Sequence, residues 1–359
     1  MNVAEVRGPL RRFAAFVPFA ALVTVIALVA LAATVTPAFA QDVVVIASTD
    51  DAIAWLQAEE WWGEANRGEQ LQVPHAMITG ISPAWRERAQ NITVAQKKEI
   101  FYRFMLPLIL HANDMVLDRR ARMERMDERL ADGGELAPDD LAWLRRLAGL
   151  LRIADEDAAA ALDGAAPGRL REVLAEALYK LDVIPPGLVL GQAAYESGYG
   201  TSRFAAEGNA LFGQWTFGGD GLVPSEQRSS LGDHRIAAFE WPFDSVRGYF
   251  VNLSAHPAYE ELRRLRAERK AAGQPLTSLA LADGLIRYSE RGQEYVDTLK
   301  GIIRVNKLDI ADDAVFRDEP VHFLVSAQGE DEAEAVRKEI DDLRRSGELA
   351  SIVQRMRLD

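Results

Sequence analysis

The chain has 359 residues, 48% of them hydrophobic and 26% charged, which is typical of a globular protein with one large domain and extensions or two modest domains. Its formal net charge of -13 and the absence of any long Lys or Arg run argue against a nucleic-acid partner, because phosphate neutralisation needs clustered cations. The absence of cysteine excludes disulfides, thiolate catalysis and cysteine-ligated metals.

The first forty residues have the pattern of an export signal. Arginines precede an apolar stretch over residues 13–35, and small residues stand just before Gln41. This pattern predicts a signal peptide over residues 1–40, cleaved before Gln41. The apolar stretch is longer than the roughly 7–15 residues usual in a signal, and about 20 residues can span a bilayer, so a retained membrane anchor through residues 13–35 is the alternative. Both forms predict a periplasmic protein.

The next segments predict a helical first half. Residues 41–90 are irregular and rich in Trp, apart from a β-like run from Asp42 to Ser48. Thr93 and Gln96 have the spacing of a capping box, and the apolar residues that follow recur at helical spacing through Pro107 into a charged segment. Further helices are predicted at residues 141–153 and 170–181. Residues 91–182 therefore form a helical region.

A second region, residues 183–309, combines helices with a short interruption. Pro185 and Pro186 suit the first turn of a helix that continues to Glu196 and should end at Gly198. The helical period disappears where glycines and aromatic residues gather, which predicts a small β-lobe or a long loop. This interruption covers residues 212–241. Helices are predicted again at residues 243–254, 276–287 and 295–305.

The last fifty residues, 310–359, differ in pattern from the region before them. Residues 321–325 are strand-like, and an acidic helix is expected from about Asp331 to Arg345, followed by Gly347. We therefore expect an appended α+β extension at the C-terminus. Nothing in the sequence defines an oligomeric state.

Glu196 is the carboxylate with the most distinctive position. It stands at the end of a predicted helix, where the negative end of the helix dipole disfavours ionisation and the neighbouring Ala193, Ala194 and Tyr195 would exclude water. Both effects raise the pKa of a carboxyl group, as a general acid requires. On the local pattern alone, a helix-end glutamate that faces solvent is the favoured interpretation.

The residues around Glu196 resemble the signature of the glucosaminidase family, glycoside hydrolase family 73, and in particular its Bax-type bacterial branch. The family helix L-A-Q-A-A-x-E-S-G/A-x-G and the following T/K-S-R-F-A-x-E-G-N-N-L-F-G are matched by LGQAAYESGYG and TSRFAAEGNALFG over residues 190–213. Gly191 and Ala210 are the departures. The resemblance extends to residues 94–114 and 288–292, and covers roughly residues 73–309.

The resemblance implies a mainly α, lysozyme-like helical domain with a small β-lobe flanking the cleft, beside the short α+β C-terminal extension. It also implies an exported peptidoglycan hydrolase that acts on glycan strands as an endo-β-N-acetylglucosaminidase, cleaving the GlcNAc-β-1,4-MurNAc linkage with Glu196 as general acid. No cofactor and no metal are expected, since the five histidines lack ligand spacing. Amidase activity is not expected.

Further site residues follow from the same resemblance. Glu226 is the expected second carboxylate, with Asp233 and Glu240 as competitors, and Tyr288 is an expected catalytic residue. The expected substrate-binding residues are Tyr195, Asn209, Phe212, Trp215 and Tyr295. Helical packing is an alternative role for Tyr295, and a place in the core of the lobe is an alternative for Phe212, Trp215 and also Trp241.

Two residues of the motif and two other functions stay open. Glu207 is expected to be structural, and Arg203 could pair either with Glu207 or with a carboxylate of the substrate peptide. A lytic transglycosylase-like muramidase also works with a single Glu on this fold, and a non-catalytic peptidoglycan-binding scaffold would keep the fold without the reaction. Whether hydrolysis retains or inverts configuration, or uses the substrate's acetamido group, depends on distances that the sequence does not contain.

Overall fold

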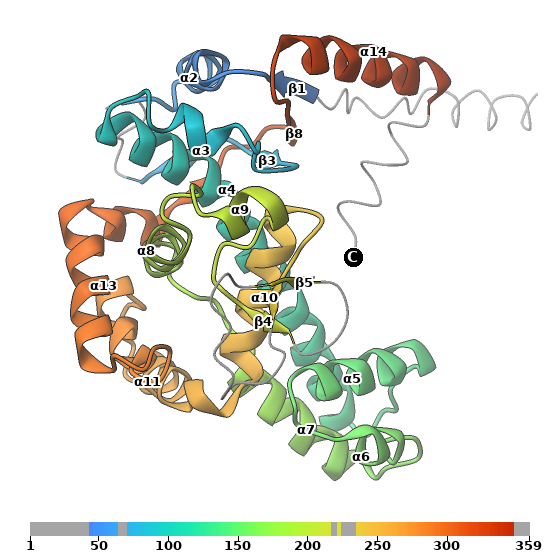
Figure 1. Ribbon diagram of the computed structural model, residues 1–359. Helices are drawn as coiled ribbons and strands as arrows, with labels where there is room; N and C mark the ends of the chain where they lie inside the picture. Colours follow the sequence, from blue (N-terminus) through green and yellow to red (C-terminus); the bar gives the residue numbers. More distant parts are fainter. Residues whose placement is uncertain (1–42, 64–69, 217–220, 224–234, 348–359) are drawn as a thin grey trace, which may run out of the picture. The chain divides into compact units, whose positions relative to one another are not determined.

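The computed structural model describes residues 43–63, 70–216, 221–223 and 235–347, which belong to a unit spanning Gln41–Asp359. The predicted signal peptide or anchor, with its apolar stretch at residues 13–35, lies outside the described residues. Helices dominate the described part, and the strands are short (Figure 1). The fold is mainly α, as predicted, and is consistent with a lysozyme-like architecture.

The α-helices are α2 (Thr49–Ala58), α3 (Trp85–Arg88), α4 (Val94–Ala131), α5 (Pro138–Leu150), α6 (Glu156–Ala160), α7 (Pro167–Lys180), α8 (Pro186–Ser197), α9 (Arg203–Gly208), α10 (Pro242–Ala255), α11 (Glu260–Ala271), α12 (Ser278–Leu281), α13 (Gln293–Val305) and α14 (Glu330–Ser346). The 3-10 helices of the described residues are η2 (Pro257–Tyr259), η3 (Ala282–Leu285) and η4 (Leu308–Asp313). The strands are β1 (Val43–Ile46), β2 (Gln72–Val73), β3 (Ala76–Ile78), β4 (Trp215–Thr216), β5 (Gly221–Leu222), β6 (Arg235–Ala237), β7 (Val315–Phe316) and β8 (His322–Ser326).

Helix α4 is the central helix of the described fold. Its capping box is present as predicted, since the Gln96 amide donates to Thr93 Oγ1 at 3.2 Å and the Thr93 amide donates to Gln96 Oε1 at 3.0 Å. The helix continues through the buried Pro107 and packs against α7, α8 and α10. Among the described helices it is long and apolar enough to cross a membrane, but 56% of its apolar window is buried, which is also found in the core helix of a globular protein.

Helix α8 lies against α4, α13 and η4 and is buried along most of its length. Pro185 is its N-cap, Pro186 its first residue, and Gly198 ends it in the left-handed region with φ of 59°, all as predicted. Glycine is required at Gly187, because a Cβ there would lie 2.3 Å from the carbonyl oxygen of Leu308. This close packing of α8 determines the position of its last turn, which carries Glu196.

The two ends of the described chain fold together. Strand β8 lies between β1 and β3 in a parallel three-stranded sheet, with Phe323 opposite both Val43 and Met77 (Figure 1). Strand β2 pairs in parallel with β7, and α14 contacts β1. The predicted strands near residues 42–48 and 321–325 and the acidic helix ending at Gly347 are confirmed as β1, β8 and α14. Their pairing in one sheet was not predicted.

The interruption after α9 is a small antiparallel sheet in the order β4-β6-β5, which confirms the expected β-lobe. The helix predicted at residues 276–287 is instead the short α12 followed by η3. There Gly284 packs so closely that a Cβ would lie 2.3 Å from the Cα of Leu262, and this contact requires a tighter turn. Helix α11 was not predicted, because eight of its 12 residues are charged and its few apolar residues show little period.

Candidate active site cleft

A cleft of about 1060 Å³ opens beside the last turn of α8. Its walls come from the end of α5, the end of α8, the loop before β4, helix α10, and the segment that leads into α13. The residues that line it are Gly149, Leu150, Arg152, Tyr195, Glu196, Phe212, Gly213, Gln214, Ala237, Phe239, Gly248, Val251, Asn252, Ala255, His256, Tyr259, Tyr288, Ser289 and Tyr295. Glu196 is the carboxylate in this lining, so the described residues place it beside a groove and not in open solvent.

The two oxygens of Glu196 have different surroundings. Oε1 accepts a hydrogen bond from the Tyr295 hydroxyl at 3.0 Å. Oε2 lies near Gly213, whose φ is 61° and where a Cβ would stand 4.0 Å away. A side chain at this position would contact Oε2. The glycine therefore leaves that oxygen uncovered on the Gly213 side.

Burial raises the pKa of Glu196 above its usual value of 4.5, and the hydrogen bond donated by Tyr295 opposes this in part. The predicted direction of the shift is confirmed, with burial as its main cause. A carboxyl group with a raised pKa keeps its proton closer to neutral pH, which is the property that a general acid needs.

A chain of buried hydrogen bonds ends at Glu196. The Tyr249 hydroxyl donates to Gln192 Oε1, Gln192 Nε2 donates to the Tyr295 hydroxyl oxygen at 2.9 Å, and Tyr295 donates to Glu196. Gln192, Tyr249 and Tyr295 are at most 1% exposed. Burial raises the pKa of both phenols, so they stay protonated as donors. Because Oε1 accepts from this chain, the proton of neutral Glu196 belongs on Oε2.

The two predicted tyrosines near α13 have different partners. Tyr295 packs in the core, which is one of the two roles that the sequence left open, and its hydroxyl also donates to Glu196; its role in substrate binding stays a prediction. Tyr288 stacks on the Tyr295 ring, with centroids 5.4 Å apart, but its hydroxyl donates to the carbonyl oxygen of Phe212 at 3.0 Å. Tyr288 therefore lines the cleft and is not hydrogen-bonded to Glu196, and its catalytic role stays a prediction.

Tyr195 and Phe212 also lie at the cleft. Tyr195 is 37% exposed, has its ring edge-on to Tyr295, and accepts a hydrogen bond from Arg291. Phe212 is only 2% exposed and stacks on Tyr249, with centroids 4.2 Å apart. Tyr195 is accessible to a ligand, whereas the Phe212 ring is part of the core beneath the cleft.

Asn209 is not in the cleft lining, contrary to its expected role in substrate binding. Its Oδ1 accepts from the amide of Ile81 at 3.0 Å, and its Nδ2 donates to the carbonyl oxygens of Phe239 at 3.1 Å and Glu240 at 2.9 Å. The side chain therefore ties three segments together. Its backbone, with φ of 50°, ends α9 in the left-handed region that asparagine tolerates.

The expected second carboxylate is not described. Glu226 and its competitor Asp233 lie outside the described residues, as does the side chain of Trp215 in β4. Glu240 is exposed and does not belong to the cleft lining.

Arg203 pairs with Glu207 at 3.1 Å and donates to the carbonyl oxygen of Val223 at 2.7 Å. The first of the two partners considered for Arg203 is therefore the one present, and Glu207 has the structural contact expected of it.

Several residues of the cleft were not predicted. Gln192 could have been found, because it stands one helical turn before Glu196 on α8 and so shares its face. Asn252 of α10, His256 between α10 and η2, and Tyr259 of η2 line the cleft, whereas Tyr249 of α10 is buried and begins the hydrogen-bond chain to Glu196. Only the tertiary packing brings these residues near Glu196.

One group of side chains in the described residues could offer three ligands to a metal ion. Carboxylate or imidazole atoms of Glu59, Glu319 and His322 lie within 4.8 Å of one another. Glu59 already pairs with Arg317 at 3.6 Å, and Glu319 accepts from the amide of His75 at 2.9 Å. None of these residues lines the cleft, so this group is not part of the site around Glu196.

Most residues that line the cleft fall in a part of the chain that matches a known protein family. Residues 172–308 match the Glucosaminidase family model, described as mannosyl-glycoprotein endo-beta-N-acetylglucosaminidase. A curated relative, Protein bax of Escherichia coli strain K12, is 34% identical over 134 residues, which is 37% of this chain and 47% of that protein. The chain thus spans about half the length of this relative. No solved structure matches the chain.

Proposed function

We propose that this chain, which carries a glucosaminidase-family region at residues 172–308, is an exported peptidoglycan hydrolase. Its activity is that of an endo-β-N-acetylglucosaminidase, which cleaves the β-1,4 linkage from GlcNAc to MurNAc with Glu196 as general acid. The observation that carries the proposal is the position of Glu196 beside a cleft of about 1060 Å³, with burial raising the pKa of its carboxyl group.

In the proposed reaction the proton on Glu196 Oε2 passes to the glycosidic oxygen as the bond to the sugar breaks. Glu196 then becomes a carboxylate, and the hydrogen bond from Tyr295 to Oε1 stabilises the new charge. Tyr295 is held for this task by Gln192 and, through it, by Tyr249. Either Glu226 activates a water molecule that attacks the sugar carbon, or the substrate's own acetamido group attacks that carbon first and water then opens the resulting intermediate.

The proposed place of action is the periplasm, reached either with cleavage before Gln41 or with an anchor through residues 13–35. N-terminal sequencing of the protein from a periplasmic fraction tests this part. A mature N-terminus at Gln41 supports a signal peptide, whereas an intact N-terminus in the membrane fraction supports the anchor. Recovery from the cytoplasm alone contradicts both.

The activity is tested by incubating purified sacculi with wild type, Glu196→Gln and Glu207→Gln. We expect Glu196→Gln to release soluble glycan at least about a hundredfold more slowly, as for loss of a general acid. Glu207→Gln, which changes an exposed carboxylate of the same motif, should keep wild-type activity.

Mass spectrometry of the products distinguishes the alternatives. Reducing-end GlcNAc supports the proposal, and anhydro-muramic ends support a lytic transglycosylase. Equal activity of wild type and Glu196→Gln contradicts the role of Glu196. Sacculus binding without product release by wild type supports a scaffold.

A further inference from the structure

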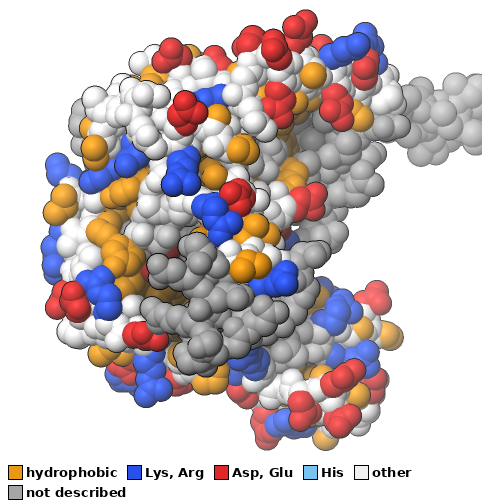
Figure 2. Space-filling model, viewed as in Figure 1, with side chains coloured by type: hydrophobic (Ala, Val, Ile, Leu, Met, Phe, Trp, Pro, Cys, Tyr) orange, Lys and Arg blue, Asp and Glu red, His pale blue; other side chains and the backbone are white. Residues whose placement is uncertain are grey.

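Long-range attraction does not bring an anionic polymer to this protein. The chain has a net charge of -13, and on the face shown in Figure 2 basic and acidic side chains lie interspersed. Peptidoglycan carries carboxylates, on the lactyl group of each muramyl residue or on its stem peptide. A site that acts on peptidoglycan is therefore expected to offer local cations to these carboxylates.

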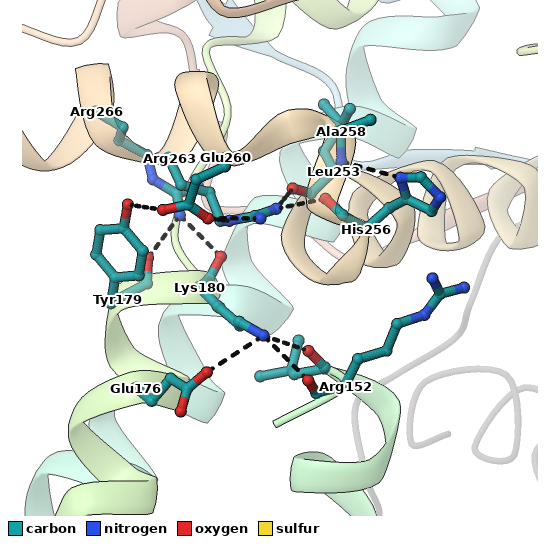
Figure 3. A network of polar contacts seen from close by, with 11 residues as sticks. Arg152, Glu176, Tyr179, Lys180, Leu253, His256, Ala258, Glu260, Arg263 and Arg266 are labelled. Carbon is teal, nitrogen blue, oxygen red and sulfur yellow. Dashed lines mark hydrogen bonds and ion pairs between the residues drawn. The ribbon is translucent and has the colours of Figure 1, made fainter. Parts of the chain in front are cut away.

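Arg152 supplies a cation in the cleft lining. It is exposed, and within the described residues no hydrogen bond or ion pair is found for its guanidinium. Figure 3 shows the side chain extending from its loop toward His256, while its backbone carbonyl accepts from Lys180. Arg152 follows α5 and lies before the family-matched residues 172–308. The part of the cleft lining that contains Arg152 therefore comes from outside the family-matched region.

The backbone holds Arg152 in a conformation that normally favours glycine. Its φ is 53°, in the turn that ends α5, where the amide of Ile153 donates to the carbonyl oxygen of Ala148 at 2.9 Å. Lys180 Nζ clamps the turn by donating to the carbonyl oxygens of Leu151 at 3.0 Å and Arg152 at 3.2 Å. A strained position that carries a long charged side chain points to a use for that side chain.

His256 adds a neutral donor beside Arg152. Its Nδ1 accepts from the amide of Ala258 at 3.1 Å, which assigns the ring proton to Nε2. Burial lowers the pKa of His256, and the charges of Arg152 and Arg263 lower it further, so the ring is neutral.

Arg263 holds His256 in place. The guanidinium of Arg263 is buried and donates to the carbonyl oxygens of Leu253 at 2.8 Å and His256 at 3.0 Å (Figure 3). It also pairs with Glu260 at 2.8 Å, and Glu260 accepts from Tyr179 at 2.6 Å. The network links α7, α10 and α11, and thereby keeps one wall of the cleft rigid.

We propose that Arg152 and His256 form a subsite that binds a carboxylate of the glycan in the same cleft as Glu196. The guanidinium offers planar paired donors that match a carboxylate, and His256 Nε2–H adds a further one. The subsite rests on the proposed function and sharpens it, because it selects carboxylate-bearing muramyl glycans over neutral oligomers of GlcNAc. The carboxylate comes from the lactyl group in peptide-free strands or from the stem peptide in intact peptidoglycan.

The test compares kcat/KM of wild type, Arg152→Gly, Arg152→Lys and Arg146→Gln on neutral GlcNAc oligomers, peptide-free glycan strands and intact sacculi. Arg152→Gly removes the cation and suits the left-handed backbone, so its Tm should not fall. We expect it to lower kcat/KM about tenfold on carboxylate-bearing glycans and to leave the neutral oligomers unaffected. Arg152→Lys should restore part of the loss. Arg146→Gln, on α5 just before Arg152 and outside the cleft lining, should match wild type.

The pattern of loss identifies the source of the carboxylate. A loss on peptide-free strands indicates the lactyl group, and a loss on intact sacculi alone indicates the stem peptide. Equal losses on neutral and anionic substrates, or no loss, overturn the subsite while the hydrolase assignment stands.

A binding measurement separates the subsite from catalysis. Calorimetric titration of Glu196→Gln and of the double variant Glu196→Gln with Arg152→Gly with peptide-free strands does not depend on hydrolysis. Weaker binding by the double variant supports the subsite even if the wild type cleaves nothing. Equal binding overturns it.

Discussion

The cleft around Glu196 and the terminal sheet β1-β8-β3 differ in the kind of contact that holds them together. At the cleft, buried polar side chains form a continuous chain of hydrogen bonds to one carboxyl group. At the terminal sheet the contacts are strand pairing between the two ends of the described chain, and the small cavity of about 90 Å³ between the sheet and α4 is lined mainly by apolar residues.

The difference follows from the cost of burying polar groups. A buried hydroxyl or amide destabilises a fold unless it is fully paired. Such groups are therefore concentrated around the carboxyl group of Glu196, whereas the terminal sheet is stabilised by strand pairing and apolar packing. The comparison predicts that the terminal sheet affects stability alone and that the cleft network affects chemistry, and three experiments test this division.

The largest effect is expected in the terminal sheet. Phe323 is 3% exposed in the central strand, so Phe323→Ala should lower the free energy of unfolding by about 3–5 kcal/mol. Denaturant titration measures this loss, with Val315→Ala, at a position 37% exposed, as a near-neutral control. At a temperature where the variant is folded, kcat on sacculi should equal that of wild type. A reduced kcat with unchanged stability would show that the sheet takes part in the cleft.

An intermediate effect is expected from Tyr295→Phe, which removes the donor to Glu196 Oε1. That hydrogen bond lowers the pKa of Glu196, so its loss should raise the pKa further and move the alkaline limb of the kcat/KM profile to higher pH. We expect kcat to fall about tenfold, since the hydrogen bond to a charged group is lost.

Tyr288→Phe is the matched control for Tyr295→Phe. The two rings stack, but Tyr288 donates to a backbone carbonyl and not to Glu196. Its pH profile should keep the wild-type alkaline limb. The positioning role of Tyr295 is rejected if both variants shift the limb equally or if neither does.

The smallest effect is a gain in stability for Glu196→Gln. The folded-state pKa of Glu196 is raised above its usual 4.5, so wild type loses stability as the pH rises from about that value through the folded pKa. The neutral glutamine has no such loss. Thermal unfolding should therefore give equal Tm values near pH 4 and a Tm higher by about 2 °C for the variant at pH 8. Glu207→Gln, at an exposed carboxylate, should show no such gain with pH.

The sequence by itself determined the local elements and the residue at the centre of the site. The capping box at Thr93, the prolines that begin α8 and Gly198 that ends it depend on neighbours within one or two helical turns. Such short-range effects are legible in spacing and residue type. The loss of the helical period over residues 212–241 left a small β-lobe or a long loop open, and the family resemblance favoured the β-lobe, which the structure confirms.

Only the tertiary structure decided which distant residues meet. It paired β1 with β8, placed His256 in the lining of the cleft, and put Tyr249 in the buried hydrogen-bond chain that leads to Glu196. It also gave Asn209 contacts with three backbone segments outside the cleft lining. It also gave the contact with Glu196 to Tyr295 and not to Tyr288. These outcomes depend on how whole helices pack, because two residues far apart in sequence come together through the summed burial of many others, which no local pattern records.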